Sequence, residues 1–297
     1  MPCVKLIKDP KLSVISGKEF SLAQFKTDYT ASLRDKSEGQ ALLDEQKRLL
    51  YELQQLLYAK DNHSVLIIFQ AMDAAGKDST ISHVFSGMFP QAGNVFSFKV
   101  PSSLEIDHDY LWRTNLCLPE RGRVSIFNRS YYEEVLVTKV HPQIILNQRI
   151  PGITELKHLD KTFWKRRYES IRSHEKQLAE NGTVILKFFL NVSKEEQKQR
   201  FLSRIDEQEK NWKFSLGDVK ERALWDQYQA AYESAIKETA APHAPWFVIP
   251  ADKKWFMRAA VCKIIVEKLQ SLNLSYPKIG EVELAALKEA RVQLMAE

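Results

Sequence analysis

Two short segments contain the residue types that phosphate chemistry needs. The first, Ala71 to Asp78, reads AMDAAGKD and places Lys77 after a run of small residues. Exposed backbone N–H groups in such a loop, and the positive end of a following helix, attract an anion. The segment departs from the phosphate-loop pattern G-x-x-x-x-G-K-[ST] at both ends, because Ala71 replaces the first glycine and Asp78 replaces the hydroxyl residue.

Asp73 is the informative residue of this loop. A carboxylate there repels phosphate unless a cation lies between them or a proton must be removed. Because Asp78 also replaces the hydroxyl that usually binds Mg²⁺, we interpret Asp73 as part of a displaced metal site. In the alternative, Gly76 only relieves crowding at a helix entry and Lys77 is solvated, which leaves Asp73 without a purpose. The other residues expected to line the phosphate are Met72, Ala74, Ala75, Gly76, Asp78 and Ser79.

The second segment, VSIFNRSYYEEV, supplies Asn128, Arg129 and Glu133 at the end of an apolar run. An asparagine oxygen can ligate Mg²⁺ directly or through water, and Arg129 can neutralise charge that develops on a phosphoryl group. We therefore expect Asp73, Asn128 and Glu133 to hold Mg²⁺, with Mn²⁺ as a substitute, and Lys77 and Arg129 to act in catalysis. The alternative is a strand that ends in a polar turn before a surface helix.

Apolar runs alternate with helical patterns and predict the elements that position these residues. Runs typical of strands buried on both faces are Ser64–Gln70, Val95–Val100, Val124–Phe127, Thr183–Leu190 and Trp246–Ile249. The predicted helices are Leu42–Lys60, Lys77–Phe89, Asp160–Glu180, Lys194–Asp206, Asp218–Thr239 and Val282–Glu297. This alternation predicts a three-layer α/β/α fold around a mostly parallel, five-stranded sheet.

Three stretches follow from this pattern: an extension with a packing helix over 1–61, a core over 62–275 and a helical tail over 276–297. The net charge is +5, from 43 Lys and Arg against 38 Asp and Glu, and gives no reason to expect a nucleic acid partner. Three widely spaced cysteines indicate reduced thiols in a cytoplasmic protein. No apolar stretch approaches the ~20 residues of a membrane span, so we expect no membrane partner.

These motifs together resemble the type-2 polyphosphate kinases, whose loop is similar to G-x-D-x-x-G-K at Asp73, Gly76 and Lys77. The version FNRSYYEEV resembles the class that phosphorylates both AMP and ADP, on which Asn128, Arg129 and Glu133 carry over. Further matches are FKVPS, HDYLWR, RFLSRID, KNWKFS and WFVIPADKKWF, and together they extend over roughly Leu42 to Leu272.

The resemblance implies a P-loop kinase-like fold with a helical lid at about 194–225, and direct, reversible transfer between polyphosphate and AMP or ADP, with guanine nucleotides as further acceptors. It also suggests a homo-oligomer, a dimer or a tetramer. Residues expected to grip polyphosphate are Arg200, Arg204, Lys210 and Lys213. Residues expected near the nucleotide are Lys99, Pro101, Ser102 and Arg113. Lys165, Arg166 and Arg167 are interpreted equally as an outer part of the polyphosphate track or as a solvated helix surface.

Two other functions fit the same motifs. An ATP-dependent kinase of a nucleotide or other small molecule shares the phosphate loop and a basic lid, and donor preference separates it from a polyphosphate kinase. A nucleotide-binding regulatory module would bind nucleotide without forming product. Arg129 and the candidate metal ligands favour an enzyme over such a module.

Overall fold

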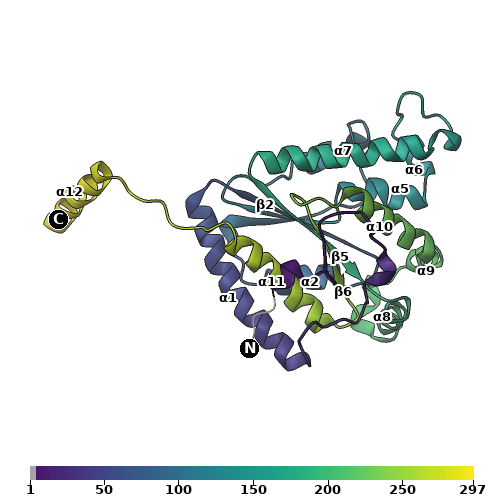
Figure 1. Ribbon diagram of the computed structural model, residues 1–297, viewed down its shortest axis with the longest axis horizontal. Helices are drawn as coiled ribbons and strands as arrows, with labels where there is room; N and C mark the ends of the chain where they lie inside the picture. Colours follow the sequence, from purple (N-terminus) through teal and green to yellow (C-terminus); the bar gives the residue numbers. More distant parts are fainter. Residues whose placement is uncertain (1–4) are drawn as a thin grey trace.

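Strands from the whole length of the chain form one sheet in the computed structural model, which describes residues 5–297 (Figure 1). The order is β1-β6-β5-β2-β4-β3. The strands are β1 (Ser13–Val14), β2 (Ser64–Ala71), β3 (Gly93–Ser97), β4 (Val124–Asn128), β5 (Thr183–Asn191) and β6 (Trp246–Pro250). Strands β2 to β6 are parallel, and β1 pairs antiparallel with β6. The predicted mostly parallel α/β sheet is confirmed, but the predicted number of five strands is wrong because β1 completes a sixth.

Helices cover both faces of the sheet. The longer ones are α1 (Lys36–Lys60), α2 (Lys77–Val84), α7 (Lys161–Glu180), α8 (Lys194–Asp206), α9 (Leu216–Ala223), α10 (Trp225–Thr239), α11 (Lys254–Gln270) and α12 (Glu281–Ala296). The short ones are α3 (Ser103–Ile106), α4 (Trp112–Asn115), α5 (Val137–Val140) and α6 (Gln143–Leu146). The 3₁₀ turns are η1 (Leu6–Lys8), η2 (Leu22–Gln24), η3 (Pro90–Ala92), η4 (Tyr131–Val135), η5 (Leu156–His158) and η6 (Gln208–Lys213).

Several predicted boundaries differ from the observed ones, and helix α2, predicted to reach Phe89, ends at Val84. Helix α1 begins earlier than predicted because the Asp35 side chain accepts a hydrogen bond from the N–H of Glu38 and caps the helix. The single helix predicted over Asp218–Thr239 is wrong, since the chain turns at Leu224 between α9 and α10. Strand β3 lies a few residues before its predicted position over Val95–Val100.

The core lies on both faces of β2. The side chains from Val65 to Phe69 are fully buried, as expected for a central strand of a parallel sheet. Helices α1, α2 and α11 pack together on one side, and α7 and α10 pack on the other (Figure 1). Helix α11 is buried around most of its circumference because α1 covers its outer side.

The N-terminal segment is part of this core. Leu6, Leu12 and Phe20 are buried, and the N–H of Val248 in β6 donates to the carbonyl of Leu12 at 2.8 Å. At the other end, every residue of α12 is exposed, and the helix lies apart from the other elements after an extended segment (Figure 1). No helix within residues 5–297 has both the length and the apolar character of a membrane span. Cys117 and Cys262 are free, whereas Cys3 lies outside the described residues.

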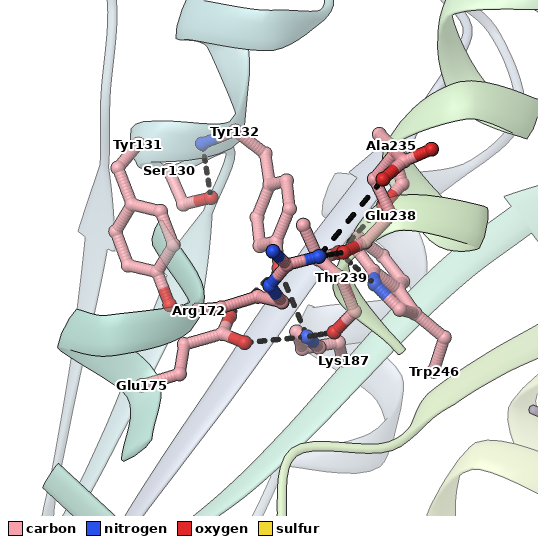
Figure 2. A network of polar contacts seen from close by, with 10 residues as sticks. All are labelled: Ser130, Tyr131, Tyr132, Arg172, Glu175, Lys187, Ala235, Glu238, Thr239 and Trp246. Atoms are coloured by element: carbon pink, nitrogen blue, oxygen red, sulfur yellow. Dashed lines mark hydrogen bonds and ion pairs between the residues drawn. The ribbon is translucent and has the colours of Figure 1, made fainter. Parts of the chain in front are cut away.

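A buried ion pair lies between the sheet and α7 (Figure 2). The ammonium group of Lys187 in β5 donates to Glu175 Oε2 at 2.6 Å, and to the hydroxyl of Tyr132 and the carbonyl of Thr239, each at 2.9 Å. The hydroxyls of Tyr131 and Tyr132 lie 2.9 and 2.7 Å from Glu175 Oε1. Burial lowers the pKa of Lys187, while the neighbouring Glu175 acts in the opposite direction. The network therefore ties turn η4 to β5, α7 and α10.

Removing one partner of this pair should destabilise the fold strongly. We expect Lys187→Met to lower the free energy of unfolding by about 3–5 kcal/mol, because it leaves Glu175 as an uncompensated buried charge. The double variant Lys187→Met with Glu175→Gln should recover at least half of that loss in urea unfolding, since no buried charge remains. A double variant as unstable as the sum of both single losses would contradict this account.

Candidate active site

The phosphate loop connects β2 to α2, and its backbone conformation favours glycine at position 76. Gly76 has φ = +102° at the entry of α2, and Ala74 also has a positive φ of +60°. A Cβ atom on Gly76 would lie 3.2 Å from the Cε atom of Met257. Ala71, which replaces the usual first glycine, pairs with Leu190 as the last residue of β2 and has no positive φ. An alanine at this extended position is therefore compatible with the loop.

The second segment lies directly beside the loop because β4 pairs with β2. Asn128 is the register partner of Phe69, and the N–H of Arg129 donates to the carbonyl of Phe69 at 3.0 Å. Arg129 has φ = +63°, a strained conformation for a non-glycine residue of the kind found at functional sites. Its guanidinium lies 3.3 Å from Asp73 Oδ1, so the two segments that the sequence singled out meet.

Opposite charges are concentrated in this half-buried region. Burial lowers the pKa of Lys77, and the positive charge of Arg129 acts in the same direction. Burial also raises the pKa of Glu133, against the effect of Arg129 and Lys77. Asp73 and Asp78 are close enough to Lys77 to favour its charged form. The site thus places two cations among three carboxylates, an arrangement suited to a polyanion that arrives with a metal ion.

A cavity of about 410 Å³ opens between the phosphate loop and the helices that follow α8. Asp73, Arg129 and Glu133 line one side of it. The residues that line it from α9 and α10 are Asp218, Glu221, Arg222, Tyr228 and Tyr232. None of these was predicted, because isolated charges and tyrosines on helices carry no motif that distinguishes a cavity wall from a solvated face.

Glu221 is held in place on the far wall of this cavity. Its Oε2 atom accepts a hydrogen bond from the hydroxyl of Tyr228 at 2.6 Å and lies 2.9 Å from Nε2 of His141. These hydrogen bonds lower the pKa of Glu221, against the effect of its burial. Helix α9 is therefore joined to α10 and to the end of α5 across the mouth of the cavity.

A second cavity, of about 230 Å³, lies on the other side of Arg129 and Glu133. Its lining is mainly apolar and includes the predicted nucleotide residues Lys99, Pro101 and Arg113. Arg113 donates to the carbonyl of Lys99 at 2.8 Å and lies 5.5 Å from the centre of the Phe98 ring. Ser102 does not line this cavity, because its hydroxyl caps α3 by accepting from the N–H of Glu105.

The predicted polyphosphate residues lie in different environments. Arg200 is buried and bonded to backbone carbonyls of the phosphate loop. Arg204 is more exposed and lies 3.6 Å from Asp218 Oδ2, whereas Lys210 pairs with Glu207. The ammonium group of Lys213 lies 4.9 Å from the centre of the Trp212 ring.

Arg167 does not fit one of the two interpretations of the basic stretch at Lys165 to Arg167, the solvated helix surface. It is buried, lies 3.0 Å from Glu134 and stacks 4.3 Å from the centre of the Tyr110 ring. Its burial excludes a solvated helix surface, while the outer part of the polyphosphate track stays a prediction. Arg166 lines an open cavity of about 680 Å³ at the start of α7, and Arg167 lies on the wall of the same cavity.

The expected metal ligands lie together but do not form a complete protein cage. Asn128 directs its Nδ2 atom to Asp78 Oδ1 at 2.8 Å, and Asp73 contacts Arg129. Within residues 5–297, no group of three or more His, Cys, Asp or Glu side chains is placed to hold a metal ion. Mg²⁺ commonly binds through one or two carboxylates, substrate phosphates and water. The residues fit that mode, because Asp73 and Asp78 offer two carboxylates within the phosphate loop, while the expected roles of Asn128 and Glu133 as ligands stay predictions.

The phosphate loop on a parallel α/β sheet, with Arg129 and carboxylates at the neighbouring strand end, defines a phosphotransferase of the P-loop kinase type. A sequence model of the polyphosphate kinase 2 family matches residues 33–276, most of the chain. The chain therefore belongs to the polyphosphate kinase 2 family of polyphosphate:nucleotide phosphotransferases.

Individual relatives agree with this assignment. The chain is 48% identical to an ADP-polyphosphate phosphotransferase of Rhodopseudomonas palustris, over 97% of this chain and 99% of the relative. It is 45% identical to an AMP/ADP-polyphosphate phosphotransferase of Meiothermus ruber, over 87% of this chain and 92% of that protein. The crystal structure of polyphosphate kinase 2 from Arthrobacter aurescens TC1 superimposes with a TM-score of 0.83 at 39% identity, over 95% of this chain and 96% of that chain.

The left-handed backbone at Gly76 gives a test of the loop. We expect Gly76→Ala to lower stability by about 1–2 kcal/mol through backbone strain, and to lower kcat/KM for phosphoryl transfer at least about tenfold because the loop must shift. Gly87→Ala is the matched control, because Gly87 has φ = +88° but its new Cβ would meet nothing within 4 Å. Equal losses of activity in the two variants would argue against a special role of the loop geometry.

Proposed function

We propose that this protein transfers phosphoryl groups from inorganic polyphosphate to ADP and AMP in the presence of Mg²⁺, reversibly and without a covalent enzyme intermediate. Arg129 and Glu133 line both cavities, Asp73 lines one of them, and Lys77 lies close to all three; this convergence carries the proposal. One cavity is lined by several charged side chains and the other is mainly apolar, so a phosphate chain and a nucleotide can approach the same point from two sides.

Transfer at this point depends on charge stabilisation and alignment. Lys77 and Arg129 place positive charge beside the migrating phosphoryl group, and the free N–H groups of the loop add partial positive charge. The terminal phosphate of the acceptor is already ionised and needs no strong general base. When bound, Mg²⁺ would neutralise charge on the phosphate oxygens, with Asp73 and Asp78 as the nearest carboxylates.

The mainly apolar cavity is the proposed acceptor site. Phe98, Val100 and Pro101 offer apolar surface for a base, and Arg113 offers positive charge at the same cavity. These contacts contain few groups that could distinguish adenine from guanine, which supports guanine nucleotides as further acceptors. Glu133 lines both cavities, so its carboxylate lies where the acceptor phosphates would meet the donor.

Product analysis with each nucleotide tests this proposal. We expect ADP and then ATP to appear when AMP is incubated with polyphosphate and Mg²⁺, and ATP when ADP is supplied; GMP and GDP should give the corresponding guanine products. Chromatography of the nucleotides measures each product. Formation of product only when ATP replaces polyphosphate as donor would identify an ATP-dependent kinase instead.

Two substitutions and metal removal test the assigned roles. We expect Lys77→Met and Asp73→Ala each to lower the turnover of ADP at least about 100-fold, because both groups act on the transferred phosphoryl group. Excess EDTA should stop the parent enzyme, and added Mg²⁺ should restore it. Lys176→Met, on the exposed side of α7, is a control that should retain turnover within about twofold. Near-normal turnover of either site variant would reject its assigned role.

A further inference from the structure

Side chains from α8 hold three consecutive carbonyl groups of the phosphate loop. Gln197 Nε2 donates to the carbonyl of Asp73 at 2.9 Å. Arg200 Nη1 donates to the carbonyls of Ala74 and Ala75 at 3.1 and 2.6 Å. Both side chains are buried, although they belong to a helix whose sequence is strongly polar. These contacts therefore hold the backbone of the phosphate loop from the side of α8.

The guanidinium of Arg200 has no donor left for another ligand. Arginine carries five N–H donors in a fixed plane, and this one makes five hydrogen bonds. Besides the two loop carbonyls, the acceptors are Glu196 Oε1 at 2.8 Å, the carbonyl of Ala251 at 2.6 Å and the carbonyl of Asp252 at 3.3 Å. Arg200 thus joins the phosphate loop to the loop that follows β6, and its expected role as a direct polyphosphate contact does not fit these bonds.

The peptide geometry shows what this arrangement does. In a trans peptide the C=O and the next N–H point in opposite directions. Holding the carbonyls of Asp73 and Ala75 toward α8 therefore turns the N–H groups of Ala74 and Gly76 away from α8. Neither N–H group makes a hydrogen bond within residues 5–297, so both stay available to an anion.

The amide of Gln197 is itself oriented by a residue of α9. Arg222 in α9 donates to Gln197 Oε1 at 2.7 Å and to the carbonyl of Lys194 at 2.7 Å. Because a guanidinium only donates, it requires the oxygen of the amide on its own side, and the Nε2 atom then faces Asp73. A chain of contacts thus connects α9, through Gln197, to the backbone of the residue that pairs with Arg129.

We propose that Gln197 and Arg200 are positioning residues, which hold the phosphate-loop peptides so that their N–H groups face the transferred phosphate, with Arg222 fixing the orientation of Gln197. The assignment rests on phosphate binding by the loop, as the proposed function requires, but not on the identity of the acceptor. It separates Arg200 from Arg204, which lies one turn further along the same helix and is more exposed.

Matched substitutions distinguish positioning from attraction of a polyanion. Arg200→Lys keeps the charge but cannot reproduce five bonds in one plane, and its control is Arg48→Lys, an exposed arginine of α1 that pairs with Glu52. Gln197→Glu removes the donor to Asp73, and its control is Gln199→Glu, which adds the same charge to the exposed side of α8.

Amide hydrogen exchange of the ligand-free protein gives a readout that does not depend on activity. We expect peptides covering residues 73–78 to exchange about tenfold faster in Arg200→Lys and Gln197→Glu than in the parent, because the loop opens more often. The two control variants should match the parent. Unchanged exchange in both positioning variants would overturn the proposal, and Gln197→Glu keeps the test valid if Arg200→Lys does not fold.

Steady-state kinetics with ADP and polyphosphate at low and high salt complete the test. Positioning predicts that kcat falls about 10–100-fold in both variants, that the KM for ADP changes less than about threefold, and that salt changes these ratios little. A loss confined to a salt-dependent rise in the KM for polyphosphate would make Arg200 a polyanion contact and overturn the proposal. A parent enzyme that does not use polyphosphate would refute the proposed function, while the exchange measurement would still decide the positioning role.

Discussion

The pairing of β2 with both β4 and β5 is the constraint on which the site depends. Strand β2 is in register with β4 from Val65 to Phe69 and with β5 along its whole length. Because all of these strands are parallel, their carboxyl ends meet at one edge of the sheet, where ligands bind in folds of this kind. The bond from the N–H of Arg129 to Phe69 continues the pairing for one more residue and brings the guanidinium to Asp73. A shift of the register by one residue would separate the two motifs and turn the buried side chains of β2 to the opposite faces.

The charges that meet at this edge stabilise each other only in part. Lys77 and Arg129 repel each other, as do Glu133 and Asp73, and burial disfavours the charged form of Lys77 and of Glu133. Each cation is compensated by carboxylates, but the cluster lacks the close bidentate pairs of a structural salt bridge, and the contact of Arg129 with Asp73 is half exposed. Such an arrangement can exchange its internal pairs for phosphate oxygens without a large penalty.

Sequence reasoning predicted those elements whose own residues carry a recognisable local pattern. Continuous apolar runs indicated the five parallel strands, and the small-residue loop before Lys77 indicated the phosphate site. Strand β1 was missed because two residues carry no periodicity, and its pairing with β6 arises only from the tertiary fold. The break at Leu224 was missed because neither glycine nor proline marks it. The environment of Arg200 could not be predicted from its spacing, since its acceptors are mostly backbone carbonyls of distant segments.

Turn η4 shows how one short segment can serve the core and the site together. Tyr131 and Tyr132 turn their hydroxyls to the buried Lys187–Glu175 pair (Figure 2), while Arg129 and Glu133, on either side of them, line the cavities. A hydrogen-bonded polar network fixes direction as well as distance, whereas apolar packing alone tolerates sliding. An ion pair in the interior offers little net stability over apolar residues of similar volume. The contribution of this network is therefore to fix the orientation of turn η4. Arg129, just before this turn, has a strained backbone that needs surroundings permitting only one conformation, and the network between the sheet and α7 supplies them.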